Sequence, residues 1–174
     1  MTPALHKLML ATLIAAALTA CGQQSGTSAA LAPIEINSGT ACSLDGMLLA
    51  DYPGPKAQIF YAGQAEPDFF CDTQEMFHLF FNPEQVKTVR GLYVQDMGRA
   101  DWDAPRGHWI DAKTAYYVPG SKRHGSMGPT IASFALEQDA AKFAAEYGGT
   151  VYRFADITSD LAVLDGGAIH DRSM

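Results

Sequence analysis

The sequence is poor in cysteine and in positive charge. Three of its 174 residues are cysteine, too few for a scaffold held by many disulfides. Lysine and arginine number 12 against 19 acidic residues, and no basic stripe is present, so nucleic acid is not an expected partner. The motifs H-E-x-x-H, G-x-x-x-x-G-K-[ST], G-x-G-x-x-G and C-x-x-C are absent, which argues against the metalloproteases, nucleotide-binding domains and zinc ribbons that they mark. Hydrophobic residues make up 48% of the chain, a globular composition that excludes wholesale disorder.

The N-terminal segment is predicted to be an export signal. A basic region ends at Lys7, and the apolar run from Leu8 to Ala20 is too short to cross a bilayer, because a spanning helix needs about 20 residues. The run ends in Leu18-Thr19-Ala20-Cys21, which resembles a bacterial lipobox, so we expect cleavage before Cys21 and a lipid on its sulfur. A buried core helix is the alternative, but residues 1–20 have neither a cap nor an amphipathic pattern.

The rest of the chain predicts an α+β protein. Residues 21–38 carry the lipidated cysteine and then a tether rich in glycine, serine and alanine. Two small units of strand–strand–helix–strand order follow in tandem, over residues 39–112 and 113–158, and residues 159–174 form a tail. In chain order we expect strands at 56–61 and 69–71, a helix begun by Asp72 and ended near Pro83, strands at 86–95, 114–118 and 130–134, a helix from about Glu137 to Tyr147, and a strand at 150–155.

The first of these helices has a clear start signal. Asp72 and Glu75 have the spacing of a capping box, in which two side chains satisfy free backbone N–H groups at the helix start. Met76 and Phe77 begin one apolar face, which places Met76 in the core.

Cys42 and Cys71 are the thiols that remain once Cys21 carries a lipid. An oxidising compartment favours a disulfide between them, and the alternative is that at least one is a thiolate ligand of a metal ion. Cys71 directly precedes a helix, whose N-terminal dipole favours a thiolate, although burial beside Phe69 and Phe70 is the simpler explanation.

Three methionines lie beside glycines in expected turns or loops, where a thioether has little packing role. They are Met47, Met97 and Met127. Thiolate and thioether sulfurs are soft ligands that select Cu(I). A tight turn at Asp45-Gly46 would bring the sulfurs of Cys42 and Met47 to one ion, and the other two methionines or His124 could complete the ligand shell. Ordinary packing of the methionines, and a plain surface position for His124, are the alternatives.

The segment Cys42-Ser-Leu-Asp-Gly-Met47, followed by Tyr52-Pro-Gly-Pro-Lys-Ala-Gln-Ile59, resembles the NosL family, the copper lipoproteins of nitrous-oxide reductase maturation. The resemblance extends over about residues 40–160 and agrees with the lipobox and with the two small units. Weaker matches follow in the family's order, at Phe70–Thr73, Val94–Gly98, Trp109–Ala112, Ala115–Val118 and Met127-Gly128.

The resemblance implies a copper chaperone that is not an enzyme, lies in the periplasm and is anchored to the outer membrane by its lipid. Such a protein carries one Cu(I) and delivers it to apo nitrous-oxide reductase for the copper–sulfide centre, docking on a periplasmic and ABC-transporter-type maturation complex. On this chain it implies Cys42 as the first ligand, then Met47 and Met97, with Met127 and His124 as further candidates. Asp45 would shape the loop.

An enzyme and a metal-independent scaffold are the alternatives to a copper chaperone. The family has been likened in fold to organomercurial lyase, an enzyme that needs a reactive thiol pair and a positioned acid, and no acid is clearly placed beside Cys42 and Cys71 in the sequence. The other is a lipoprotein scaffold that bridges partners of an envelope assembly complex without metal.

Overall fold

The computed structural model describes residues 31–81 and 86–164. The predicted signal peptide, Cys21 and Pro83 lie outside these residues. The elements in chain order are β1 (Ala57–Tyr61), β2 (Asp68–Phe70), α2 (Thr73–Phe80), β3 (Val89–Gln95), β4 (Trp109–Asp111), β5 (Tyr116–Val118), β6 (His124–Gly125), β7 (Gly128–Pro129), β8 (Ala132–Phe134), α3 (Glu137–Tyr147) and β9 (Tyr152–Arg153). Short 3-10 helices occupy Leu49–Asp51, Ala112–Thr114, Phe154–Asp156 and Ser159–Ala162. Within the described ranges, no helix is both long and apolar enough to span a bilayer.

The first sheet is antiparallel, with the strand order β2-β1-β3-β4. Every residue of β1 is buried, because both faces of this strand are covered. Ile59 points into the main core under α2, whereas the amide of Gln58 exchanges two hydrogen bonds with the backbone of Ile34, at 2.9 and 3.0 Å. The segment that precedes the sheet therefore covers the face opposite α2.

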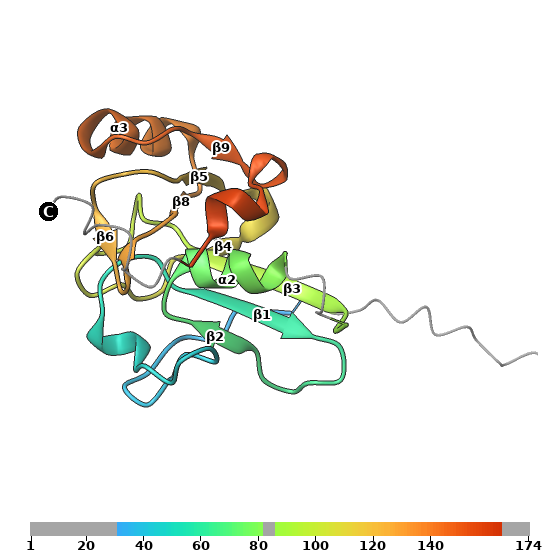
Figure 1. Ribbon diagram of the computed structural model, residues 1–174. Coiled ribbons are helices and arrows are strands. Elements are labelled where there is room, and N and C mark those ends of the chain that lie inside the picture. Colours follow the sequence, from blue (N-terminus) through green and yellow to red (C-terminus); the bar gives the residue numbers. More distant parts are fainter. Residues whose placement is uncertain (1–30, 82–85, 165–174) are drawn as a thin grey trace, which may run out of the picture. The chain divides into compact units, whose positions relative to one another are not determined.

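Helix α2 begins at the predicted capping residue. Asp72 Oδ1 accepts a hydrogen bond from the backbone N–H of Gln74 at 2.8 Å, which satisfies one of the free donors of the first turn. Met76 and Phe77 are fully buried, and the ring of Phe77 packs edge-on against Tyr117 of β5 with centroids 4.9 Å apart. The apolar face of α2 thus joins the first sheet to the second half of the chain (Figure 1).

The second sheet has the order β8-β5-β9 and is covered by α3. Side chains alternate across β5, so Tyr117 lies in the core shared with α2, whereas Val118 packs toward Phe143 of α3. The two sheets are also joined through their backbones, because Met97 N–H donates to the carbonyl of Ser133 at 2.9 Å. The described residues, 31–81 and 86–164, belong to one compact unit.

The predicted α+β class is confirmed, and strand–strand–helix–strand order appears in both halves. Three details differ from the expectation. Strand β4 was not predicted, and the glycine-rich stretch after β5 contains the β6–β7 hairpin. The last expected strand shortens to β9, because the chain turns into a 3-10 helix that packs Phe154 against Phe77 and Phe80.

Gly54 lies where the backbones of the two halves of the chain come close together. It has a φ of 81°, and a Cβ there would lie 2.7 Å from the Cα of Gly125 in β6. Gly63 has the same φ but open space around it. We expect Gly54→Ala to lower the free energy of unfolding by about 3 kcal/mol and Gly63→Ala by about 1 kcal/mol, because both incur the positive-φ cost and only the first also meets backbone. Urea unfolding measures both, and equal losses would contradict the close contact.

Candidate metal centre

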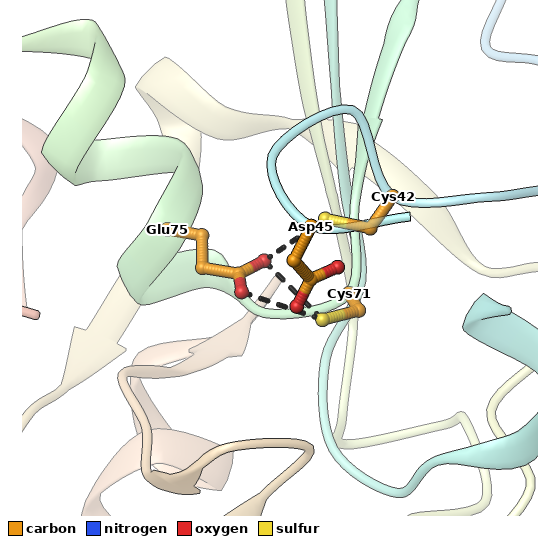
Figure 2. Close-up of side chains that lie close together, drawn as sticks. All are labelled: Cys42, Asp45, Cys71 and Glu75. Atoms are coloured by element: carbon orange, nitrogen blue, oxygen red, sulfur yellow. Dashed lines mark hydrogen bonds between the residues drawn. The ribbon is translucent and has the colours of Figure 1, made fainter. Parts of the chain in front are cut away.

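Four side chains that can bind a metal ion converge beside the start of α2. They are Cys42, Asp45, Cys71 and Glu75, and one ligand atom from each lies within 4.8 Å of all the others (Figure 2). Three of the residues are buried and Asp45 is exposed, so the group lies just beneath the surface.

Cys42 is positioned by a tight turn. Its N–H donates to the carbonyl of Met47 at 2.8 Å, and its own carbonyl accepts from the N–H of Gly46 at 2.9 Å. Gly46 has a φ of 79°, a conformation that glycine adopts at little cost, and Asp45 Oδ1 accepts from the N–H of Met47 at 2.9 Å. The reversal expected at Asp45-Gly46 is present, and it brings the backbones of Cys42 and Met47 together.

This turn docks against the end of β2. Ser43 N–H donates to the carbonyl of Phe69 at 2.7 Å, and Ser43 Oγ accepts from the N–H of Phe69 at 3.1 Å. Cys71 follows β2 directly, so the docking places Cys42 beside it. Glu75 comes from the first turn of α2, four residues after Cys71, and its carboxylate contacts the thiol of Cys71.

The carboxylate of Glu75 accepts hydrogen bonds from both thiols. Cys42 Sγ lies 3.4 Å from Oε2, and Cys71 Sγ lies 3.3 Å from Oε2 and 3.5 Å from Oε1. Both cysteines are free in the structure and do not form the disulfide that an oxidising compartment would favour. Cys42 is 4% exposed and Cys71 is fully buried.

The pKa values of the two thiols move in opposite directions. Hydrogen bonding with the neighbouring Cys71 sulfur lowers the pKa of Cys42, whereas hydrogen bonding with Cys42 and burial raise the pKa of Cys71. Burial raises the pKa of Glu75.

Two further charged groups are buried next to this centre. Lys56 Nζ donates to the carbonyls of Pro53 at 2.8 Å and of Cys71 at 3.0 Å, and burial lowers the pKa of Lys56 to about 8. Burial also raises the pKa of Asp72 to about 7. Asp72 Oδ1 accepts from Thr130 Oγ1 at 2.6 Å, whereas Oδ2 has no hydrogen-bond partner in the part of the chain that the structure describes.

The other ligands expected from the sequence fall in three different places. Met47 is half-buried in the small apolar cluster that contains both cysteines. Met97 packs in a different cluster, with Trp102 and the residues under α3. Met127 and His124 belong to the β6–β7 hairpin, where both are exposed, and His124 is not part of the four-residue group.

The hairpin nevertheless lies against the metal centre. Ser126 Oγ donates to the carbonyl of Cys71 at 2.7 Å, and Trp102 Nε1 donates to the carbonyl of His124 at 3.0 Å. Met127, which follows Ser126 directly, is 52% exposed. An exposed thioether therefore belongs to a hairpin that is hydrogen-bonded to the backbone of Cys71.

The model of the family described as NosL matches residues 33–162, which is most of the chain. The chain belongs to the NosL family. The copper-binding lipoprotein NosL of Stutzerimonas stutzeri is 40% identical over 98% of this chain and 93% of its own length, and that of Achromobacter cycloclastes is 37% identical over 90% and 82%. The crystal structure of the copper chaperone NosL from Shewanella denitrificans matches with a TM-score of 0.70 and 38% identity, over 75% of this chain and 98% of that one. The resemblance seen in the sequence is thereby confirmed.

Glu75 is part of the site in this NosL-family chain but was not among the ligands predicted from the sequence. Glu75 was expected only in the capping box, and its contact with the thiol of Cys71, which precedes the helix, becomes visible in the fold. Asp45 was expected only to shape the turn, and the structure places its carboxylate among the possible ligands. The pairing of Cys42 with Cys71 has no local signal, because it depends on the docking of the turn onto β2.

The buried carboxyl of Asp72 predicts a pH dependence of stability in the metal-free protein. Its pKa is near 7 when folded and near 3.8 when unfolded, so between about pH 4 and pH 7 the folded state binds more protons and this contribution is lost as pH rises. Asp72→Asn removes the titration. Relative to the wild type, it should therefore gain up to roughly 4 kcal/mol of unfolding free energy between pH 4 and pH 7, since one pKa unit is about 1.4 kcal/mol.

Chemical unfolding at several pH values measures this difference. Asp160→Asn, at an exposed position, corrects for the loss of one negative charge. A difference between wild type and Asp72→Asn that stays constant with pH would show that Asp72 is ionised throughout this range.

Proposed function

We propose that this chain is a copper chaperone, which binds one Cu(I) at the centre built around Cys42 and Cys71 and delivers it to apo nitrous-oxide reductase. The observation that carries the proposal is the convergence of two free thiols beneath an exposed turn. Thiolates are soft ligands that prefer Cu(I) to hard cations such as Mg²⁺ or Ca²⁺. The copper named in the relatives' descriptions supports the same cargo.

The donor set fits a cargo ion that is taken up and handed on. Cys42 lies on a turn whose next four residues are exposed, so this ligand lies directly beneath the surface. Met127 supplies a thioether on the adjoining hairpin, and Met47 a second one within the cysteine cluster. We assign Met97 to packing against Trp102, and His124 to the surface of the hairpin beside the centre.

The cellular setting in the proposal comes from the N-terminal sequence and the family. Export by the predicted signal peptide and a lipid on Cys21 would hold the chain in the periplasm at a membrane, which we place at the outer membrane. A maturation complex of periplasmic and ABC-transporter-type proteins would receive it there, before copper passes to the reductase. The acidic balance of the chain favours a basic docking face on the partner.

The first test is an anaerobic Cu(I) titration against a competing chelator. The full chain carrying Cys21→Ser, purified in detergent, has Cys42 and Cys71 as its two remaining thiols. We expect one tight equivalent, weakened at least about 100-fold by Cys42→Ser and about 10-fold by Met127→Leu, because each change removes a soft donor. Met97→Leu is the matched control, since it makes the same substitution in a methionine assigned to packing, and it should leave the affinity unchanged.

Equal and weak binding by all of these proteins would contradict the copper site. A metal-independent scaffold of an envelope assembly complex would then be the better hypothesis. Loss of affinity in Met97→Leu but not in Met127→Leu would instead assign the thioether ligand to Met97, in the cluster that contains Trp102.

Delivery needs its own experiment. The copper-loaded chain is mixed with apo nitrous-oxide reductase and its assembly proteins, and the copper in the reductase is counted after separation. We expect copper to move from the chaperone faster than from the same concentration of copper held by the chelator. Equal rates of transfer from the chaperone and from the chelator would contradict the proposed delivery, but would leave the proposed copper binding intact.

A further inference from the structure

The two thiols of the centre are placed as a pair that can be joined covalently. Their sulfur atoms lie within 4.8 Å of each other, and both donate to the carboxylate of Glu75. A disulfide needs a sulfur–sulfur distance of about 2.05 Å, so the two atoms must approach by less than about 3 Å. They belong to segments far apart in sequence, and the fold alone brings them together (Figure 2).

The two cysteines differ in how close they lie to the surface. The carbonyl of Cys71 accepts hydrogen bonds from Lys56 Nζ and from Ser126 Oγ, and its side chain is fully buried. Cys42 starts the turn that docks on β2, and residues 43–46 of this turn are exposed. Cys42 is therefore the one of the two cysteines that lies nearer to solvent and to an external reagent.

We propose that Cys42 and Cys71 are a reversible thiol–disulfide modification site, oxidised by small disulfides such as oxidised glutathione. The sulfur of Cys42 attacks one sulfur of the small disulfide, forms a mixed disulfide and releases one thiol. The sulfur of Cys71 then attacks Cys42, forms the internal disulfide and releases the second thiol. The protein loses two protons and two electrons, which together are two hydrogen atoms, and one small disulfide is reduced to two thiols.

Glu75 favours the reduced form of this pair. In the dithiol its buried carboxylate accepts a hydrogen bond from each sulfur, and in the disulfide neither sulfur carries a proton to donate. Oxidation therefore removes two hydrogen bonds from a buried carboxylate, which is unfavourable. The pair is thus set to stay reduced unless the surroundings are clearly oxidising.

Oxidation closes the centre to a soft metal ion, a consequence that rests on the proposed function. Thiolates are the ligands, and a disulfide has none. Conversely, a bound ion occupies both sulfurs and protects them from the small disulfide. The chain would then accept copper only while its thiol pair is reduced.

The test equilibrates the metal-free full chain carrying Cys21→Ser with glutathione buffers of different oxidised-to-reduced ratio. Acid quenching, alkylation and intact mass measurement then count free thiols. We expect one species that is two hydrogen atoms lighter and carries neither an alkyl group nor glutathione, and that reverts with excess reduced glutathione. Cys42→Ser and Cys71→Ser are each unable to form it. If the unmutated pair keeps two alkylated thiols, or takes up only glutathione, the proposal is wrong.

Glu75→Ala tests the role of the carboxylate, with Glu137→Ala as its control. Glu137 occupies the first turn of α3, is exposed and lies on the other helix of the described chain. We expect half-oxidation of Glu75→Ala at an oxidised-to-reduced ratio at least about tenfold lower than in the parent, and no shift in Glu137→Ala. Glu75→Gln, which keeps one oxygen acceptor, should lie between them and guards against a folding defect in the alanine variant. No shift in either Glu75 variant would overturn the role of this residue.

A Cu(I) titration of the oxidised and re-reduced protein separates the two proposals. Loss of the tight equivalent on oxidation, and its return on reduction, supports the closure of the site. Unchanged binding by the disulfide form would overturn the closure. If the disulfide forms reversibly but the reduced chain binds no copper, the modification site stands and the proposed function fails.

Discussion

The carbonyl oxygen of Cys71 accepts hydrogen bonds from both halves of the chain, and much of the fold depends on this contact. It accepts one hydrogen bond from Lys56, which precedes β1, and another from Ser126 in the β6–β7 hairpin. The next residue, Asp72, caps α2 and accepts a hydrogen bond from Thr130, just before β8. A junction between one strand and one helix is thereby tied to both halves of the chain, and the side chain of Cys71 has little freedom to move.

This arrangement concentrates buried charge around the two thiols. Lys56, Asp72 and Glu75 are all within a few per cent of complete burial, and such groups are costly to bury unless they are paired or hydrogen-bonded. Lys56 is satisfied by two carbonyls, but Asp72 keeps one oxygen without a partner among the described residues. Proteins tolerate such a cost mainly at functional sites, and here the excess of acceptors over cations surrounds the place proposed for a cation.

The sequence predicted the features that depend on near neighbours. The Asp72 cap, the turn at Asp45-Gly46 and the buried face of α2 all follow from residues within one turn of each other, and the structure has all three. The features that escaped prediction depend on distant contacts. β4 exists because it pairs with β3, and β9 is short because Phe154 leaves the strand to pack on α2. The contact between Cys42 and Cys71 likewise depends on Ser43 meeting Phe69 across the fold, which no local pattern encodes.

The different depths of Cys71 and Cys42 also bear on how a buried ion can leave the proposed site. A site whose ligands all came from the core would hold its ion until the core opened, and that costs a large share of the free energy of folding. Here one sulfur is anchored at the β2–α2 junction, whereas the other lies on a turn whose middle is exposed, beside a hairpin that presents Met127 to solvent. In the proposed chaperone, an incoming ligand from a partner can replace the donors nearer the surface one at a time while Cys71 still holds the ion. Each step then exchanges one sulfur for another, and the ion is never released as a bare cation into water.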